Sequence, residues 1–394
     1  MKILQVIASF PPAFAYGGPA RVAYDISKEL VKKGHEVTVY TTDVLNKSSR
    51  YNFESNPIWL DGIEVYYFRN VSNYFASNCG ITCSPEMLLA FKNNLRNFDL
   101  VHCHEYRAFE AVLLHHYAKK YQIPYILQAH GAALPMFQKQ KLKNMFDFCF
   151  GSNLLNDASK LIAVTITEAK QYAKLGFSED KIEIVPNGIF LSEYENLPEK
   201  GIFRNKYGIT SNEKIVLYLG RIHRIKGINL LVEAFSDLIS KVDGVKLVIA
   251  GPDDGFLSTL KIQIEKLNIG DRIVFTGPLY ERDKLEAYVD ADVYVLPSVY
   301  EIFGVAVLEA CACGTPAIVT DRCGISDFVE KVGYVVESDK NELSNALFKV
   351  LFKESIREKF GEKSNKLLQE QFSWDKIVIN LESLYMRLRL CDKS

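Results

Sequence analysis

The chain has 394 residues, of which 48% are hydrophobic and 24% are charged. Single hydrophobic cores stop growing near about 250–300 residues, so this length predicts two domains. The formal net charge of -1 excludes a global electrostatic attraction to nucleic acid, and we expect no nucleic-acid partner. None of the 8 cysteines forms a CxxC pair, which indicates free thiols in a reducing compartment.

The N-terminal segment has the pattern that opens a doubly wound sheet. ILQVI (3–7) is a continuous apolar run, typical of a fully buried strand. A loop rich in proline and glycine follows, and apolar residues then recur with helical spacing until Gly34 ends the helix. HEVTVYTT (35–42) returns as a second strand. The order strand, glycine loop, helix, strand predicts a parallel α/β sheet.

The same alternation continues through the first half of the chain. The helical stretch 106–120 separates two predicted strands, and two shorter strands follow them. The predicted strands are 99–105, 125–131, 161–165 and 181–185. Pro186-Asn187-Gly188 then breaks the pattern, and the irregular segment after it predicts a linker.

A second α/β unit begins with the strand KIVLYLG (214–220), a basic loop and a helix over 228–241. Further strands are predicted at 246–251, 272–277 and 292–298, and a helix begins near 305. The tail 372–388 reads as a helix whose apolar face comprises Trp374, Ile377, Ile379, Leu381, Leu384 and Leu388.

These elements predict an α/β fold with two Rossmann-like, doubly wound parallel-sheet domains facing across a cleft. Open parallel sheets bind ligands at the carboxyl ends of their strands, so we expect the ligand between the two domains. The predicted division is an N-terminal domain over 1–190, a linker over 191–212, a C-terminal domain over 213–371 and a terminal helix over 372–394.

The N-terminus imitates a signal peptide, because Lys2 precedes ILQVIASF and Ala13-Phe14-Ala15. The apolar run is short and ends at Pro11-Pro12, so we interpret it as a buried strand. No run reaches the ~18 residues of a spanning helix, and we expect a cytoplasmic protein. Residues 136–150 mix three lysines with Met and Phe, which predicts either a peripheral contact with anionic lipid at the inner face of the membrane or an ordinary amphipathic cleft helix.

The segment 298–316 carries two glutamates around the start of a predicted helix. Glu301 precedes the helix and Glu309 lies inside it. A carboxylate accepts two hydrogen bonds at once, so this pair could hold the two vicinal diols of a nucleotide sugar. Free amides after Gly304 at the helix start suit phosphate oxygens. A solvated Glu301 and a structural Glu309 are the alternative.

The loop GRIHRIKG (220–227) follows a strand and has glycines at both ends, which allow close backbone approach. Arg221 and Lys226 could neutralise a diphosphate leaving group, which some cation must stabilise. A basic surface loop is the alternative.

Two features of the first half are weaker candidates. Gly17 and Gly18 precede a helix and could approach phosphate oxygens, although a plain tight turn explains them equally well. His130 ends a predicted strand, where it could reach a reacting sugar, or it could be an ordinary half-buried histidine.

Metal sites are not expected. His102, His104 and Glu105 lie close together, but no second ligand pair is spaced to complete a zinc site. Asp290-Ala291-Asp292 imitates a metal-binding acidic triplet, but it lies at a helix-to-strand junction and is interpreted as a cap or turn.

Together these segments resemble the GT-B glycosyltransferases of the large retaining group called family 4. The most specific match is E-x-F-G-x-x-x-x-E-A-x-A-x-G-T-P, from Glu301 to Pro316. The other matches are the GGPARVAYDISKELVKKGHEVTVYT opening, V-H-x-H (101–104), H-G (130–131), V-P-N-G-I (185–189) and G-R-I-x-x-x-K-G. Ile302 stands where the family often has Pro or Gly.

The resemblance implies a role for each matching position. Arg221 and Lys226 would bind the diphosphate, and His130 would lie beside the transferred sugar. Glu301 would hold the sugar together with the amides of Phe303, Gly304 and Val305. Glu309 would take the ribose hydroxyls. The remaining donor contacts would be Gly17 and Gly18 at the phosphates and Leu279, within 276–280, at the base. The tail helix would cross back onto the first domain, and members of the family need no metal.

We therefore expect a retaining enzyme that moves a hexose-type sugar from a UDP-, GDP- or ADP-sugar, with no cofactor. The acceptor would be a glycan, a lipid-linked molecule or a small molecule, in polysaccharide or glycoconjugate biosynthesis. No second carboxylate presents itself as a nucleophile, so a front-face reaction is expected. The alternatives are a nucleotide-sugar epimerase of the same architecture and a non-catalytic nucleotide-sugar-binding protein.

Overall fold

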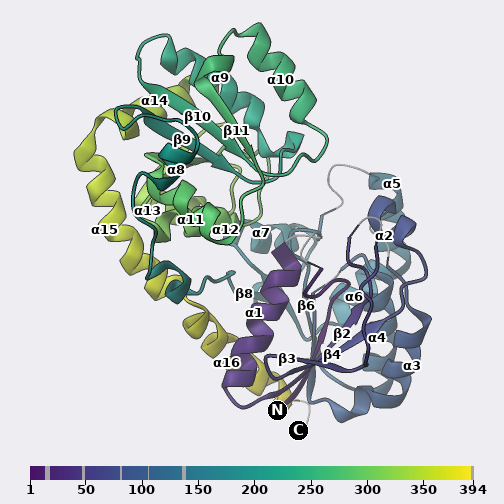
Figure 1. The fold of residues 1–394 in the computed structure, drawn as a ribbon. Helices are drawn as coiled ribbons and strands as arrows, with labels where there is room; N and C mark the ends of the chain where they lie inside the picture. Colours follow the sequence, from purple (N-terminus) through teal and green to yellow (C-terminus); the bar gives the residue numbers. More distant parts are fainter. Residues whose placement is uncertain (14–17, 47–48, 80–81, 105, 135–138, 392–394) are drawn as a thin grey trace. The chain divides into compact units, whose positions relative to one another are not determined.

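The computed structural model describes residues 1–13, 18–46, 49–79, 82–104, 106–134 and 139–391. The chain divides into two compact units, which are described separately. The first comprises Met1–Asn187 and Trp374–Ser394, and the second comprises Gly188–Ser373. Figure 1 shows the helices and strands of both units, coloured by their position in the sequence.

The first unit is built on an eight-stranded sheet with the order β3-β4-β2-β1-β5-β6-β7-β8. Neighbouring strands are parallel except β3 and β4, which form an antiparallel hairpin at one edge. The strands are β1 (Lys2–Val6), β2 (Glu36–Thr42), β3 (Ile58–Leu60), β4 (Ile63–Phe68), β5 (Leu100–Cys103), β6 (Tyr125–Gln128), β7 (Lys160–Ala163) and β8 (Ile182–Ile184).

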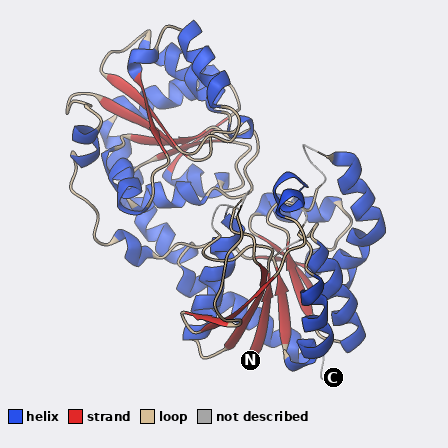
Figure 2. Ribbon diagram, turned by 45° about the vertical axis from the view of Figure 1, so that its right-hand side comes forward, coloured by secondary structure: helices blue, strands red, loops and turns tan. Residues whose placement is uncertain are grey.

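Helices cover both faces of this sheet, as Figures 1 and 2 show. The helices of the first unit are α1 (Gly18–Lys32), α2 (Asn73–Cys79), α3 (Pro85–Asn94), α4 (Phe109–Tyr121), α5 (Gln140–Phe146), α6 (Ser152–Asp157), α7 (Ile166–Lys174) and α16 (Trp374–Cys391). The central strands β5 and β6 are buried along their whole length. This burial agrees with their mostly apolar sequences, LVHC and YILQ.

The second unit is built on a six-stranded, all-parallel sheet with the order β11-β10-β9-β12-β13-β14. Its strands are β9 (Lys214–Leu219), β10 (Val245–Ala250), β11 (Ile273–Gly277), β12 (Val293–Leu296), β13 (Ala317–Thr320) and β14 (Gly333–Val336). Its helices are α8 (Ile202–Lys206), α9 (Ile228–Ile239), α10 (Leu257–Lys266), α11 (Glu281–Asp290), α12 (Val305–Ala312), α13 (Ser326–Val332), α14 (Lys340–Phe352) and α15 (Glu354–Gln371). Both units therefore have the predicted doubly wound α/β architecture.

The segment 191–212, which the sequence presents as a linker, is part of the second unit. Phe203 in α8 is buried, and the Asp290 carboxylate accepts hydrogen bonds from the amides of Gly201 (2.6 Å) and Arg204 (3.0 Å). Asp290 thus caps α8, and Asp292 accepts a hydrogen bond from the Arg204 guanidinium at 3.1 Å. The acidic triplet is structural, in line with its interpretation as a cap.

The tail helix α16 belongs to the first unit and packs against α1. Trp374, Ile377, Leu381 and Leu384 are buried, as expected, but the prediction for Ile379 is wrong because that side chain is 49% exposed. Ile379 lies only two residues after Ile377, which places it off the stripe that a 3.6-residue period defines.

Candidate active site

In the second unit, the loop 220–227 after β9 packs against the end of β12. Gly227 has φ +65°, and a Cβ added there would lie 1.9 Å from the carbonyl oxygen of Pro297. Only glycine allows this approach. It brings Lys226, on the short 3-10 turn Arg224–Lys226, against the segment that carries Glu301.

Lys226 and Glu301 form an ion pair, in which the Lys226 ammonium donates to Oε2 of Glu301. Both side chains are mostly buried. The backbone of Glu301 is also fixed, because its amide donates to the carbonyl of Arg322 (3.2 Å) and its carbonyl accepts from the amide of Gly324 (2.7 Å). Two residues that are far apart in the sequence and were separate candidates therefore form one structural cluster.

Helix α12 begins directly after this cluster. Gly304 adopts φ +96° before the first helical residue, Val305. Within the described residues, no hydrogen-bond acceptor faces the amides of Phe303, Gly304 and Val305. Amides at a helix N-terminus attract anionic or hydroxyl oxygen atoms. The Phe303 side chain is buried and packs edge-on against Phe372, so only its backbone faces this region.

Glu309 lies within α12, and α11 holds its carboxylate. Oε1 pairs with the Lys284 ammonium at 2.6 Å, and Oε2 accepts a hydrogen bond from the Tyr288 hydroxyl at 3.0 Å. Lys284 and Tyr288 are four residues apart, so they share one face of α11. Sequence reasoning missed both residues, although this spacing was visible.

Arg221 lies in the same loop as Lys226 but is directed elsewhere. Its side chain is 59% exposed, and its guanidinium donates to Oδ2 of Asp254 at 2.6 Å. Its backbone carbonyl accepts a hydrogen bond from the Tyr218 hydroxyl at 2.8 Å. Asp254 was not a candidate in the sequence, because an Asp-Asp pair in a loop gives no signal of its partner. Leu279, the expected base contact, follows β11 and is buried.

In the first unit, His130 follows the carboxyl end of β6 and adopts φ +49°. Its Nε2 lies 3.2 Å from Nδ1 of His104, which follows β5, and the next amide, of Gly131, donates to the buried carboxylate of Glu168. Gly18 begins α1 and is exposed. Gly17 lies outside the described residues, as does Glu105.

Two family models match the chain, one over each half. The model described as Glycosyltransferase Family 4 matches residues 16–193, and the model described as Glycosyl transferases group 1 matches residues 199–367. Together the two matches cover most of the sequence. The chain belongs to the family 4, group 1 glycosyltransferases.

Relatives and solved structures agree with this assignment. An uncharacterized glycosyltransferase of Methanocaldococcus jannaschii is 29% identical over 411 residues, 98% of this chain and 98% of that protein. The N-acetyl-alpha-D-glucosaminyl L-malate synthase of Bacillus anthracis is 25% identical over 412 residues, 100% of this chain and 99% of that protein. The crystal structure of HepE from Anabaena, in complex with UDP and glucose, superposes with a TM-score of 0.77 at 17% identity and covers 98% of this chain and 100% of that chain. The two units thus have the GT-B glycosyltransferase fold.

Three histidine rings of this glycosyltransferase stack on one another. The rings of His102 and His104 stack with centroids 4.0 Å apart, and those of His104 and His130 stack at 5.4 Å. In the part of the chain that the structure describes, no group of three or more His, Cys, Asp and Glu side chains is arranged to hold a metal ion. Burial lowers the pKa of His102 and of His130 to about 3 and the pKa of His104 well below its ordinary value, so all three are neutral at physiological pH.

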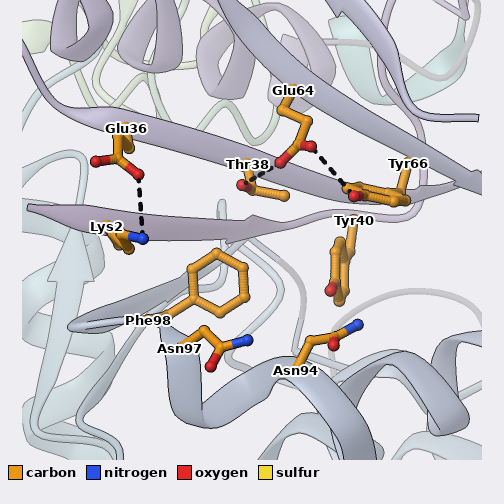
Figure 3. Close-up of a pocket in the computed structure, with 9 residues that line it drawn as sticks. All are labelled: Lys2, Glu36, Thr38, Tyr40, Glu64, Tyr66, Asn94, Asn97 and Phe98. Carbon is orange, nitrogen blue, oxygen red and sulfur yellow. Dashed lines mark hydrogen bonds and ion pairs between the residues drawn. The ribbon is translucent and has the colours of Figure 1, made fainter.

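A cavity of about 250 Å³ in the glycosyltransferase's first unit lies away from these residues. Figure 3 shows it between β1, β2, β4 and the end of α3, lined by Lys2 and Glu36 among others. Lys2 and Glu36 begin their strands, whereas His104 and His130 follow the carboxyl ends of theirs. Within the first unit, the cavity therefore lies at the amino ends of the strands, opposite to His104 and His130, and we assign it no catalytic role.

A patch of exposed apolar side chains covers α5 and the turn after it. It comprises Leu142, Met145, Phe148 and Phe150, and exposed Lys139 and Lys141 lie beside it. Arg107 anchors the patch, because its guanidinium binds both carboxylate oxygens of Asp147 and the carbonyls of Ala132 and Ala133. The patch is thus fixed to the loop that follows His130. Residues 136–138 of the predicted membrane segment lie outside the described residues, and no helix within those residues is long and apolar enough to span a membrane.

Proposed function

We propose that this glycosyltransferase moves a hexose-type sugar from a nucleotide diphosphate sugar to a small-molecule, lipid-linked or glycan acceptor, with retained configuration. The observation that carries the proposal is the Lys226–Glu301 pair beside the amides that begin α12, which have no acceptor among the residues that the structure describes. A cation, a carboxylate and several N–H donors are the groups that a diphosphate and a sugar diol require.

In the proposed reaction, the bond between the anomeric carbon and the diphosphate oxygen breaks while the acceptor oxygen bonds to the same face of that carbon. The departing diphosphate oxygen takes the proton of the acceptor hydroxyl. Lys226 and Arg221 stabilise the charge on the leaving group, which is the main catalytic contribution. To reach the leaving group, Arg221 separates from Asp254. Because this ion pair is exposed, breaking it costs little free energy.

Glu301 and the amides of Phe303, Gly304 and Val305 are proposed to hold the sugar, and Glu309 the ribose. Leu279 is proposed to contact the base, Gly17 and Gly18 the phosphates, and His130 the transferred sugar. The structurally similar HepE was crystallised in complex with UDP, which supports a uridine donor. The Bacillus anthracis relative is named for a malate product, which supports a small acceptor with a hydroxyl group.

Thermal-shift measurements with UDP-, GDP- and ADP-sugars test the donor proposal, because a bound ligand raises the apparent stability by mass action. We expect one base to stabilise the protein well above the others. NMR of the product then reads the anomeric configuration, which the proposal predicts to be unchanged. Stabilisation by none of the donors, or an inverted product, would contradict it. Donor turnover without acceptor would favour an epimerase instead.

We also propose peripheral membrane association through the exposed patch on α5, supported by the 88% exposure of Phe148 and the exposure of Lys139 and Lys141. Phe148→Ser should reduce sedimentation with anionic vesicles. Phe348→Ser, at an exposed aromatic residue of the second unit, is the matched control. If the wild-type protein does not sediment with phosphatidylglycerol vesicles, the proposal fails.

A further inference from the structure

His130 is half-buried and stands at one end of a row of five polar side chains, of which the other four are buried. The proposed reaction uses only His130. The row runs from His130 to His104, Gln5, Tyr385 and His102. Its members come from the ends of β6 and β5, from β1 and from the C-terminal helix α16. All lie within the first unit.

The direction of the hydrogen bonds follows from the Gln5 amide. Its carbonyl oxygen Oε1 lies 2.7 Å from Nε2 of His104. An amide oxygen only accepts, so His104 carries its proton on Nε2, and Nδ1 of this neutral ring is an acceptor. Nε2 of His130, 3.2 Å from that Nδ1, must then be the donor. His130 is therefore the Nε2–H tautomer, with a lone pair on Nδ1.

The C-terminal helix completes the row. The Gln5 side chain also lies against the Tyr385 hydroxyl, which is 2.7 Å from Nδ1 of His102. Burial raises the pKa of Tyr385, so its hydroxyl stays protonated and donates a hydrogen bond to Nδ1 of His102. Helix α16 is held in place by Glu382, which accepts a hydrogen bond from His35 at 2.8 Å, and by Arg389, which pairs with Asp99 at 3.1 Å.

We propose that Gln5, His104 and Tyr385 are positioning residues that hold His130 as its Nε2–H tautomer, with Nδ1 presented as a hydrogen-bond acceptor for a sugar hydroxyl. Helix α16, which belongs to the first unit, thus contributes to the positioning of His130, because it supplies Tyr385. This inference rests on the proposed contact between His130 and the transferred sugar.

The backbone around His130 is fixed independently of the row. The Gly131 amide donates to Oε1 of Glu168, and the Val164 amide donates to Oε2 of the same carboxylate at 2.8 Å. Because Glu168 holds the main chain next to His130, the row needs to orient only the imidazole ring of His130. The hydrogen bonds from His130 to His104 and from His104 to Gln5 restrict the His130 ring to one orientation.

The tautomer can be read directly from the resting protein, without donor or acceptor. The chain has 7 histidines, and the His130 signals in ¹⁵N-histidine NMR spectra can be assigned by their loss in His130→Gln. We expect the proton on Nε2 at pH 7. A proton on Nδ1 of His130 would overturn the inference whether or not the protein transfers sugar, so its failure is distinguishable from failure of the proposed function.

The positioning role is tested with two substitutions at one residue. His104→Phe keeps the stacked ring but removes both nitrogens, and we expect kcat/KM for the preferred donor to fall roughly 10–100-fold. His104→Asn can place its amide oxygen near the position of Nδ1, and it should retain activity within about tenfold of wild type. Equal losses in both variants, or a wild-type rate in His104→Phe, would refute the assignment.

Tyr385→Phe tests the contribution of α16, with Tyr125→Phe as its matched control. Both substitutions remove one buried tyrosine hydroxyl from the first unit, but that of Tyr125 donates to the carbonyl of Leu154, away from the row. Only Tyr385→Phe should lower kcat/KM and broaden the His130 ring signals. Identical behaviour of the two variants would contradict the role of the C-terminal helix.

Discussion

Glu168 is a buried carboxylate whose ionisation should make the stability of the first unit depend on pH. It is fully buried and accepts hydrogen bonds from the amides of Gly131 and Val164. Burial raises its pKa from the ordinary value of 4.5 to about 7, although the two amides act in the opposite direction. Its protonated form is therefore favoured in the folded protein.

A carboxyl group with a raised folded-state pKa contributes stability that is fully present below its unfolded pKa. That stability is lost as the pH rises through the folded pKa. The difference between 4.5 and about 7, at about 1.4 kcal/mol per pH unit, corresponds to about 3 kcal/mol. Glu168→Gln keeps the shape of the protonated acid and cannot ionise. The unfolding free energy of this variant minus that of wild type should therefore increase by about 3 kcal/mol between pH 4.5 and pH 8.

Tryptophan fluorescence during urea unfolding measures this difference selectively. The chain has 2 tryptophans, Trp59 and Trp374, and both belong to the first unit. Trp374 is only 2% exposed, so its emission will report unfolding of that unit. Groups other than Glu168 titrate in both proteins and cancel in the difference. Glu54→Gln, at an exposed glutamate of the same unit, is the control. A stability difference that does not change with pH would refute the reasoning.

Three further predictions concern the second unit. Gly227→Ala should destabilise the second unit by about 3 kcal/mol more than Gly208→Ala, as measured by calorimetry. Both glycines have φ +65°, but only at Gly227 would an added Cβ meet the Pro297 carbonyl. Equal losses of stability in the two variants would contradict this prediction. Lys284→Met should raise the donor KM about tenfold by releasing Glu309, whereas Lys206→Met breaks only an exposed pair with Asp283 and should not. Arg221→Ala should lower kcat about 100–1000-fold, and a rate within threefold of wild type in a nucleotide-release assay would remove the leaving-group role.

The fold was predictable because its signals are local. Largely buried strands such as β6 and β9 have mostly apolar sequences, and Gly131 and Gly220 follow their ends. The hairpin of β3 and β4 escaped notice, because β3 has only three residues and none of them is fully buried. The predicted face of α16 was mostly correct, since four of its six residues are buried, Leu388 is half-buried and Ile379 is exposed.

The candidate residues were identified by their types and order, but their partners were not. Asp254 pairs with Arg221 across 33 positions, and Tyr385 reaches His102 across 283. Such contacts depend on how the strands are ordered in the sheet, which no local pattern encodes. For the same reason the sequence placed His102 and His104 close together without showing that Tyr385 and Gln5 are their hydrogen-bond partners.

Calorimetric titration with nucleoside monophosphates and diphosphates of the preferred base tests the central claim most directly, because it needs no acceptor. If Arg221 and Lys226 bind the diphosphate, the wild-type protein should bind the diphosphate much more tightly than the monophosphate. Lys226→Met should remove most of that difference. Equal affinity of the wild-type protein for both nucleotides would contradict the account.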